Sequence, residues 1–199
     1  MKLFLKSLCV GFVISILFTF VPFEGECKEI SDSVFRVHIL ANSDSKQDQA
    51  LKLKVRDAVI AHGETLLSDV HSKDEAMEIV SKNIDDFVSV AEQVVIDEGF
   101  DYEVTALIDK VWFDTRYYGD ITMPSGVYDA LRICIGKAQG KNWWCVMYPS
   151  LCLYAASDTD SLDKSLTAPQ YRILSSDGKY EFRLKIVEVF SRVCSCFSD

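Results

Sequence analysis

Apolar and polar residues alternate in two stretches of the chain, and this pattern predicts β-strands. Every second residue is apolar from Phe35 to Ala41, and the same alternation recurs over Tyr102–Ile108 and continues through Val111–Phe113. A period of two places successive side chains on opposite faces of a sheet. We therefore expect an early strand and a later one, separated by 60 residues.

Two more β-rich runs surround a segment that is rich in turn residues. Val127–Ile135 and Trp143–Tyr148 are apolar, and Lys137–Asn142 between them carries glycine, lysine and asparagine. A strand, a short turn and a strand usually form an antiparallel pair. The sequence thus predicts that these two strands are neighbours.

The segment after the first strand has helical periodicity. Ser45 and Asp48 resemble a capping box at its start, and Gly63 supplies a stop signal. One face of this helix carries the apolar residues and a histidine, namely Leu51, Val55, Ala58, Val59 and His62.

Two further helices follow from the same reasoning. One starts at Ser72, with Glu75 three residues later, and runs to Gly99. The other covers Tyr180–Val193, after a polar loop at Ser157–Ala168. The predicted fold class is α+β, a two-layer arrangement with a mostly antiparallel sheet and about three helices packed on it.

The first 27 residues differ in pattern from the rest. Lys2 and Lys6 precede the apolar run Leu8–Val21, which is typical of an export signal and short for a membrane span of about 20 residues. We interpret residues 1–27 as an export signal or an N-terminal anchor, and residues 28–199 as a single α+β domain. Whether the segment is cleaved or stays as a membrane tether is open at this point.

Charge and composition exclude some classes of partner and cofactor. The 199-residue chain has a net charge of -9, which disfavours binding to nucleic-acid phosphates. Its cysteines and histidines lack the paired spacing of a zinc site. We therefore predict no nucleic acid, no metal and no cofactor.

Export changes the interpretation of the seven cysteines. Cys145 and Cys152 flank a Tyr-Pro-Ser bend, so a disulfide between them is favoured in an oxidising compartment. Two reduced, buried thiols are the close alternative. The pairing of Cys27, Cys134, Cys194 and Cys196 does not follow from the sequence.

Aromatic residues near the two later strands are candidates for contact with a partner. Trp143 and Trp144 are adjacent on one strand and must point to opposite faces, so one of them can be exposed near Tyr117 or Tyr118. Exposed aromatic clusters are typical of protein-binding surfaces. The opposite interpretation, a tryptophan covered by a helix or loop, has equal weight. The remaining candidate contact residues are Asp120 beside the tyrosines, and Asn42 and Asp44 as a second patch.

Catalysis has weaker support. His38, Ser43 and Asp44 are the best residues for a hydrolase, but no nucleophile elbow or metalloprotease motif is present. The carboxylates Asp109, Asp114, Asp120 and Asp129 allow a calcium site or a glycosidase pair to be drawn, although solvated loop acids explain them better. We predict that the chain is not an enzyme.

Three stretches resemble the stage II sporulation protein R family of endospore-forming bacteria: Phe35–Val59, Tyr118–Cys152 and Tyr180–Phe190. The resemblance implies a signalling protein that the forespore exports into the space between the forespore and mother-cell membranes. It also implies a partner, a membrane-embedded aspartic protease of the mother cell that processes a sigma-factor precursor. The alternatives are an exported hydrolase acting on cell-wall or peptide substrates, and a structural protein tethered by its N-terminal segment.

Overall fold

The structure is a computed structural model, and it describes residues 4, 7, 10, 11, 25, 27–118 and 121–149. These residues belong to two compact units. The sheet unit comprises Ser33–Trp112 and the described part of Val127–Thr167. The hairpin unit comprises Phe113–Gly126 and the described residues up to Asp32. The prediction of a single domain after residue 27 stays a prediction.

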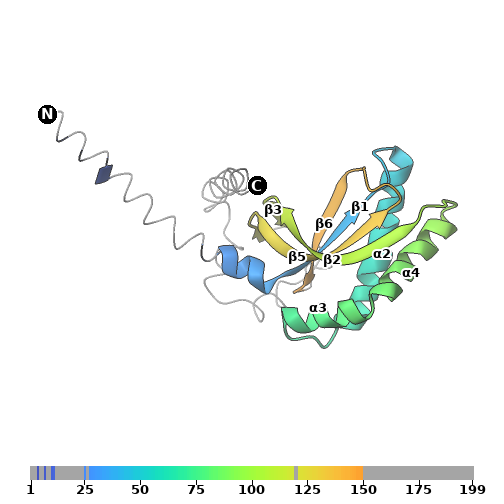
Figure 1. Cartoon of the computed structure of the whole chain (residues 1–199), viewed down its shortest axis with the longest axis horizontal. Helices are drawn as coiled ribbons and strands as arrows, with labels where there is room; N and C mark the ends of the chain where they lie inside the picture. Colours follow the sequence, from blue (N-terminus) through green and yellow to red (C-terminus); the bar gives the residue numbers. More distant parts are fainter. Residues whose placement is uncertain are drawn as a thin grey trace. The chain divides into compact units, whose positions relative to one another are not determined.

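A four-stranded sheet forms the centre of the sheet unit (Figure 1). Its strands lie in the order β2 (Val104–Phe113), β5 (Gly126–Ile135), β1 (Phe35–Leu40) and β6 (Asn142–Tyr148). β1 is parallel to β5 and antiparallel to β6. The sheet is therefore mixed and mostly antiparallel, and the predicted α+β class is confirmed.

The predicted pairing of the two later strands is wrong, because β1 lies between β5 and β6. Leu40 at the end of β1 is opposite Cys134 of β5 on one side and Asn142 of β6 on the other. All six residues of β1 are buried, including Arg36, whose side chain has 0% exposure. A strand that is buried on both faces occupies the middle of a sheet, and the loop between β5 and β6 must then pass over its end.

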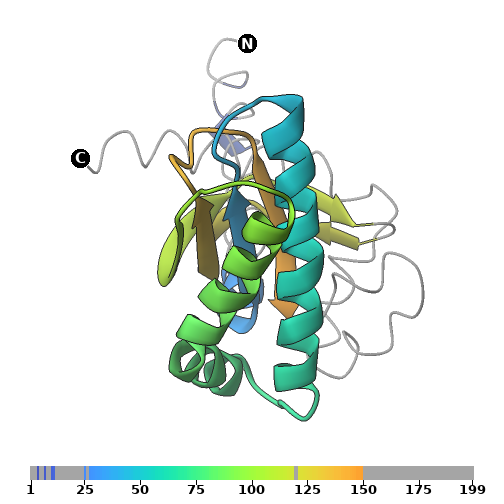
Figure 2. The same cartoon turned by 90° about the vertical axis from the view of Figure 1, so that its right-hand side faces the viewer.

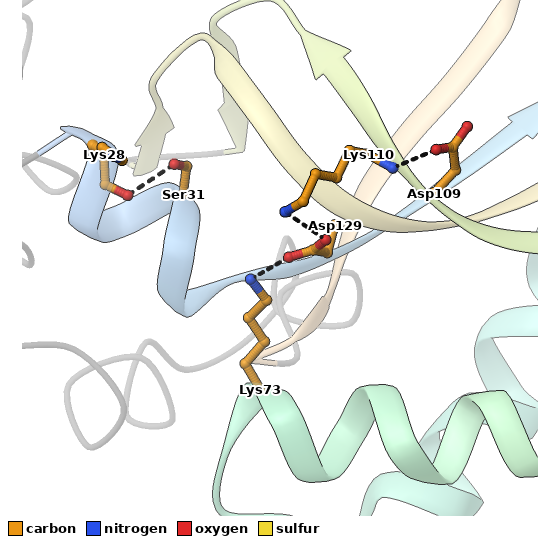
Figure 3. A network of polar contacts seen from close by, with 6 residues as sticks. All are labelled: Lys28, Ser31, Lys73, Asp109, Lys110 and Asp129. Carbon is orange, nitrogen blue, oxygen red and sulfur yellow. Dashed lines mark hydrogen bonds and ion pairs between the residues drawn. The ribbon is translucent and has the colours of Figure 1, made fainter.

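Helices cover one face of this sheet. α2 (Lys46–Leu67) and α4 (Ile84–Asp97) lie side by side on it, and α3 (Lys73–Lys82) precedes α4 (Figure 2). Each helix packs a buried apolar face, which includes Val55 and Val59 of α2 and Phe87 of α4. Lys73 at the start of α3 forms an ion pair of 2.5 Å with Asp129 of β5 (Figure 3).

The predicted starts of the first two helices are confirmed, and one predicted end is wrong. Ser45 caps α2 by accepting from the Asp48 N–H, and Ser72 caps α3 by accepting from the Glu75 N–H. However, α2 does not stop at Gly63, which is buried within it. A Cβ atom at Gly63 would lie 3.4 Å from the Met147 methyl group, so the missing side chain serves close packing against β6.

The helix predicted from Ser72 to Gly99 is divided in two. Asn83, with φ -114° and ψ 23°, separates α3 from α4, and its side-chain amide donates to the Ile79 carbonyl at 2.7 Å. Amide side chains compete with the backbone for helical hydrogen bonds in this way. Gly99 follows the end of α4 with φ +80°, as expected for a glycine after a helix.

The hairpin unit contains two short strands that the sequence pattern did not predict. β3 (Arg116–Tyr118) and β4 (Ile121–Met123) are antiparallel. Residues 27–32 of the same unit are helical, and Ser31 donates to the Lys28 carbonyl there (Figure 3). In the part of the chain that the structure describes, no helix combines the length and the apolar character needed to cross a membrane. The loop predicted at Ser157–Ala168 and the helix predicted at Tyr180–Val193 lie outside the described residues.

Candidate functional site at the loop junction

The chain segments that follow β1 and β5 bind each other at one edge of the sheet. We call residues 41–45 and 136–141 together the loop junction. The Gly140 N–H donates to the Ala41 carbonyl at 2.9 Å, and the Gln139 N–H donates to the Asn42 carbonyl at 3.2 Å. These bonds hold the loop from β5 to β6 against the end of β1.

Side chains of the first segment bind the backbone of the second. The Lys137 N–H donates to Asn42 Oδ1 at 3.0 Å, and the Lys141 N–H donates to Asp44 Oδ1 at 2.7 Å. Asn42 is half-buried, whereas Asp44 is exposed. Both residues were predicted as a contact patch, and the structure gives each of them a role in shaping the junction.

The two glycines of the loop allow this close approach. Gly136 has φ +57°, and a Cβ atom there would lie 2.5 Å from Asn42 Oδ1. At Gly140, a Cβ atom would lie 2.2 Å from the Ser43 carbonyl oxygen. Since real Cβ contacts are longer, any side chain at Gly140 would push the two segments apart.

A buried carboxylate fixes the junction from inside. Asp48, at the start of α2, is 4% exposed. It accepts hydrogen bonds from Asn42 Nδ2 at 3.0 Å, from the Ser43 hydroxyl, and from the Tyr102 hydroxyl at 3.1 Å. Burial by itself raises the pKa of Asp48, but the bonds from Ser43, Asn42 and Tyr102 outweigh it and leave the pKa below its usual value. The carboxylate is therefore ionised at neutral pH and holds three segments together.

A buried lysine supports the other end of the loop. Lys52, one turn after Asp48 in α2, is 5% exposed. Its Nζ donates to Gln49 Oε1 at 2.7 Å and to the Lys141 carbonyl at 2.8 Å. Sequence reasoning missed this residue as well as the buried position of Asp48. The available signal was that both continue the apolar stripe of α2 through Leu51 and Val55, where polar residues are unexpected.

The two adjacent tryptophans point to opposite faces of β6, as predicted. Trp143 is opposite Ile39 on the helix side, where the Arg56 guanidinium lies 5.3 Å from its ring centre. Trp144 is opposite His38, and their ring centres are 5.8 Å apart. Both tryptophans are half-buried, so each presents part of its ring at the surface.

The predicted tyrosines belong to the hairpin unit. Tyr117 in β3 is 55% exposed, and Tyr118 is half-buried. Asp120 lies outside the described residues. The predicted cluster of these residues with a tryptophan stays a prediction.

The three residues considered for hydrolysis are engaged separately. The Ser43 hydroxyl donates to Asp48, and Asp44 accepts from the Lys141 backbone. Burial and the charges of Arg132 and Arg36 lower the pKa of His38 to about 4, although a hydrogen bond with Asn142 opposes them. In this arrangement the hydroxyl of Ser43 donates its hydrogen bond to the Asp48 carboxylate. It does not donate to a histidine that could act as a base.

One of the four scattered carboxylates, Asp129, has two lysine partners. Asp129 pairs with Lys73 at 2.5 Å and with Lys110 at 3.0 Å (Figure 3). Burial raises the pKa of Asp129, but these two lysines outweigh burial and lower it overall. Among residues 27–118 and 121–149, no group of three or more histidines, cysteines and acids could hold a metal ion.

The cysteines are only partly described. Cys27 and Cys134 take no part in a disulfide. Cys145 is 3% exposed, and Cys152 lies outside the described residues. The disulfide between Cys145 and Cys152 stays a prediction.

Comparison with known proteins places the chain in one family. The model of the family described as stage II sporulation protein R matches residues 31–158. The stage II sporulation protein R of Bacillus subtilis (strain 168) is 37% identical over 139 residues, which are 70% of this chain and 62% of that relative. No solved structure matches. The matched region contains β1, both segments of the loop junction and all three helices of the sheet unit, and the chain belongs to the stage II sporulation protein R family.

Proposed function

We propose that this chain is an exported signalling protein of sporulation, which activates a membrane-embedded aspartic protease of the mother cell. The protease then processes a sigma-factor precursor. In this proposal the chain acts as a ligand and carries out no chemistry of its own. Membership of a sporulation protein family supports the biological setting, and the loop junction supports the mode of action.

The observation that carries the proposal is the way the loop junction is built. Exposed loop residues are held by the buried charges of Asp48 and Lys52 and by two glycines at close approach. A loop that is fixed before binding loses little conformational entropy when a partner docks. Such a surface is suited to recognition by shape.

The hydrolase alternative has less support. Its best serine, Ser43, donates its hydroxyl hydrogen bond to Asp48, which also accepts from Asn42 and Tyr102. A nucleophilic serine needs a base that takes the proton during attack and later releases it to the leaving group. A carboxylate with a lowered pKa and several donors is a poor base.

The proposed location is the space between the forespore and mother-cell membranes. The basic start at Lys2 and Lys6 and the apolar run Leu8–Val21 support export. A protein in this space can reach the outer side of a mother-cell membrane protein without entering the mother cell. Measuring the mass of the exported form would decide between a cleaved leader and a tether.

Co-expression tests the proposal directly. The candidate protease and its sigma-factor precursor are produced in a host that does not sporulate, with and without this chain. We expect processing only when the chain is present and exported. Equal processing in its absence would refute the activator role.

Three variants then separate the two modes of action. Trp143→Ala and Trp144→Ala each remove one half-buried ring, and we expect at least one of them to reduce processing while the chain stays folded. His38→Gln keeps a polar group of similar reach but cannot act as a histidine base. Processing at the wild-type level in His38→Gln is expected for a ligand, whereas its loss in a folded variant would favour the hydrolase.

A further inference from the structure

Lys52 is a buried cation whose acceptors are both neutral. Its Nζ donates to the amide oxygen of Gln49 and to the carbonyl oxygen of Lys141. Among the described residues, no carboxylate forms an ion pair with it. Burial lowers the pKa of Lys52, and a nearby charge from Asp44 only partly compensates. A buried ammonium group with unused donor capacity favours the arrival of an anion.

Arg56 lies one turn further along the same face of α2. Its guanidinium is stacked over Trp143 of β6, and it pairs with Asp57, its neighbour in sequence, at 2.6 Å. Arginine and tryptophan are the residues most enriched at energetically important positions in protein interfaces. The pair is half-buried, so both groups are partly accessible.

Lys141 adds a third cation. Within the junction, its backbone N–H donates to Asp44 and its carbonyl accepts from Lys52. Lys141 itself is exposed. The three residues are neighbours, because Lys52 Nζ donates to the Lys141 carbonyl at 2.8 Å and Arg56 follows Lys52 by one turn of α2. The charges of Lys141 and Arg56 also lower the pKa of Lys52. We call Lys52, Arg56, Lys141 and Trp143 the Lys141 cluster.

The Lys141 cluster is positive in a chain whose net charge is -9. The carboxylates beside it are already engaged, because Asp44 accepts from a backbone N–H and Asp57 pairs with Arg56. Three cations therefore face two carboxylates in a chain that otherwise has more acids than bases. Charge complementarity favours an acidic partner segment at this surface, and the negative charge of the rest of the chain disfavours binding of such a segment elsewhere.

We propose that the Lys141 cluster binds an acidic peptide segment of the partner protein, with a carboxylate against Arg56 and Lys141 and an apolar group against Trp143. This inference rests on the proposed function and adds the chemistry of the partner's contact segment. Asp57 Oδ1 accepts from Nε and Nη2 of Arg56, so a partner carboxylate would bind the opposite edge of the guanidinium, formed by Nη1 and Nη2, through two hydrogen bonds.

The test uses the purified full chain with two probes. The first probe is membrane vesicles that carry the candidate protease, with matched vesicles of the same lipid composition that lack it. The second probe is the peptide hexaglutamate, with hexaglutamine as its neutral control. Binding of hexaglutamate is followed by the tryptophan fluorescence of the chain and is compared with that of Trp143→Phe.

The variants are Lys141→Glu, Lys141→Arg and Arg56→Gln, with Lys82→Glu as the matched control. Lys82 is an exposed lysine of α3 that pairs only with Glu78 among the described residues. We expect Lys141→Glu and Arg56→Gln to weaken binding to hexaglutamate and to the protease-bearing vesicles by roughly threefold to tenfold. The effect should be larger at low salt. Lys141→Arg and Lys82→Glu should bind like the wild type.

Each possible result decides one of the two proposals. Protease-dependent binding that is equal in all variants would overturn the Lys141 cluster and leave the activator role intact. A hexaglutamate response without protease-dependent binding would support the cluster and refute the activator role. No response to hexaglutamate, or equal binding to protease-free vesicles, would overturn an acidic peptide as the ligand; the second of these results would indicate a lipid surface.

Discussion

Replacing Asp48 tests whether one buried carboxylate holds the loop junction. In Asp48→Ala, the donors from Asn42, Ser43 and Tyr102 lose their common acceptor at a site that is 4% exposed. Hydrogen bonds to a charged group contribute about 1.5–3 kcal/mol each, and breaking a buried network typically costs about 3–5 kcal/mol in total because losses are not additive. We expect the free energy of unfolding of Asp48→Ala to fall by about 3–5 kcal/mol.

Asp48→Asn separates the effect of charge from that of geometry. Its amide oxygen can accept from Asn42 and Ser43 while its Nδ2 donates to the Tyr102 hydroxyl oxygen. The shape of the network is then kept, and only the charge is lost. The expected destabilisation is about 1–2 kcal/mol, the difference between charged and neutral hydrogen bonds.

The pH dependence gives a second, independent result. The pKa of Asp48 in the folded chain is below the unfolded value of 3.8. Stabilisation from the ionised carboxylate is therefore fully present above about pH 5 and is lost as the pH falls through 3.8 towards the lower folded pKa. The difference in stability between the wild type and Asp48→Asn should shrink over the same window.

Urea unfolding of the full chain, followed by circular dichroism at pH 7 and at several acidic values, measures these differences. Asp57→Asn is the control, since Asp57 is exposed and its ion pair should contribute less than about 1 kcal/mol. If Asp48→Ala were destabilised by less than about 1 kcal/mol, the role assigned to the buried carboxylate would be refuted.

Three further predictions follow from the same junction and its strands. Gly140→Ala places a methyl group 2.2 Å from the Ser43 carbonyl, so we expect a loss of at least about 2 kcal/mol in urea unfolding, and wild-type stability would contradict the close approach. Tyr102→Phe removes one hydroxyl donor to the buried carboxylate, which should cost about 1–2 kcal/mol by the same measurement, and a neutral result would show that this bond contributes nothing. Oxidised protein should have one pair of free thiols fewer than the reduced form, and full alkylation of Cys145 and Cys152 under non-reducing denaturation would exclude their disulfide.

Local signals in the sequence predicted most elements of the sheet unit. Alternation identified β1 and β2, and apolar β-rich runs around a turn segment identified β5 and β6. The serine caps at Ser45 and Ser72 marked the starts of α2 and α3. These predictions succeed because periodicity and capping depend on residues close in sequence.

The predictions that failed depend on contacts distant in sequence. The order of the strands is set by the burial of β1 on both faces, and no short-range pattern shows which strand lies between two others. Gly63 indicated a helix end, whereas in the folded chain it makes room for Met147, 84 positions further along. The short loop between β5 and β6 likewise predicted that these two strands are neighbours, whereas β1 lies between them.

The candidate site was predicted in part for the same reason. Asn42, Asp44 and Trp143 were chosen from the sequence, and the structure assigns the first two to shaping the junction. The buried positions of Asp48 and Lys52 were not predicted, because polar residues on the apolar side of a helix become understandable only when their partners are known. Lys52 donates to the Lys141 carbonyl, and Asp48 accepts from the Tyr102 hydroxyl. Both partners are distant in sequence.

The insertion of β1 between β5 and β6 has a consequence for the timing of folding. Arg36 of β1 donates to the carbonyl of Cys145, which is 109 positions later in the chain. A chain that emerges gradually during synthesis can form α2 and α3 early, but β1 must wait for β6 before both its edges are paired. The complete sheet therefore exists only after residue 148 has been synthesised, and a product truncated before β6 would leave one edge of β1 unpaired.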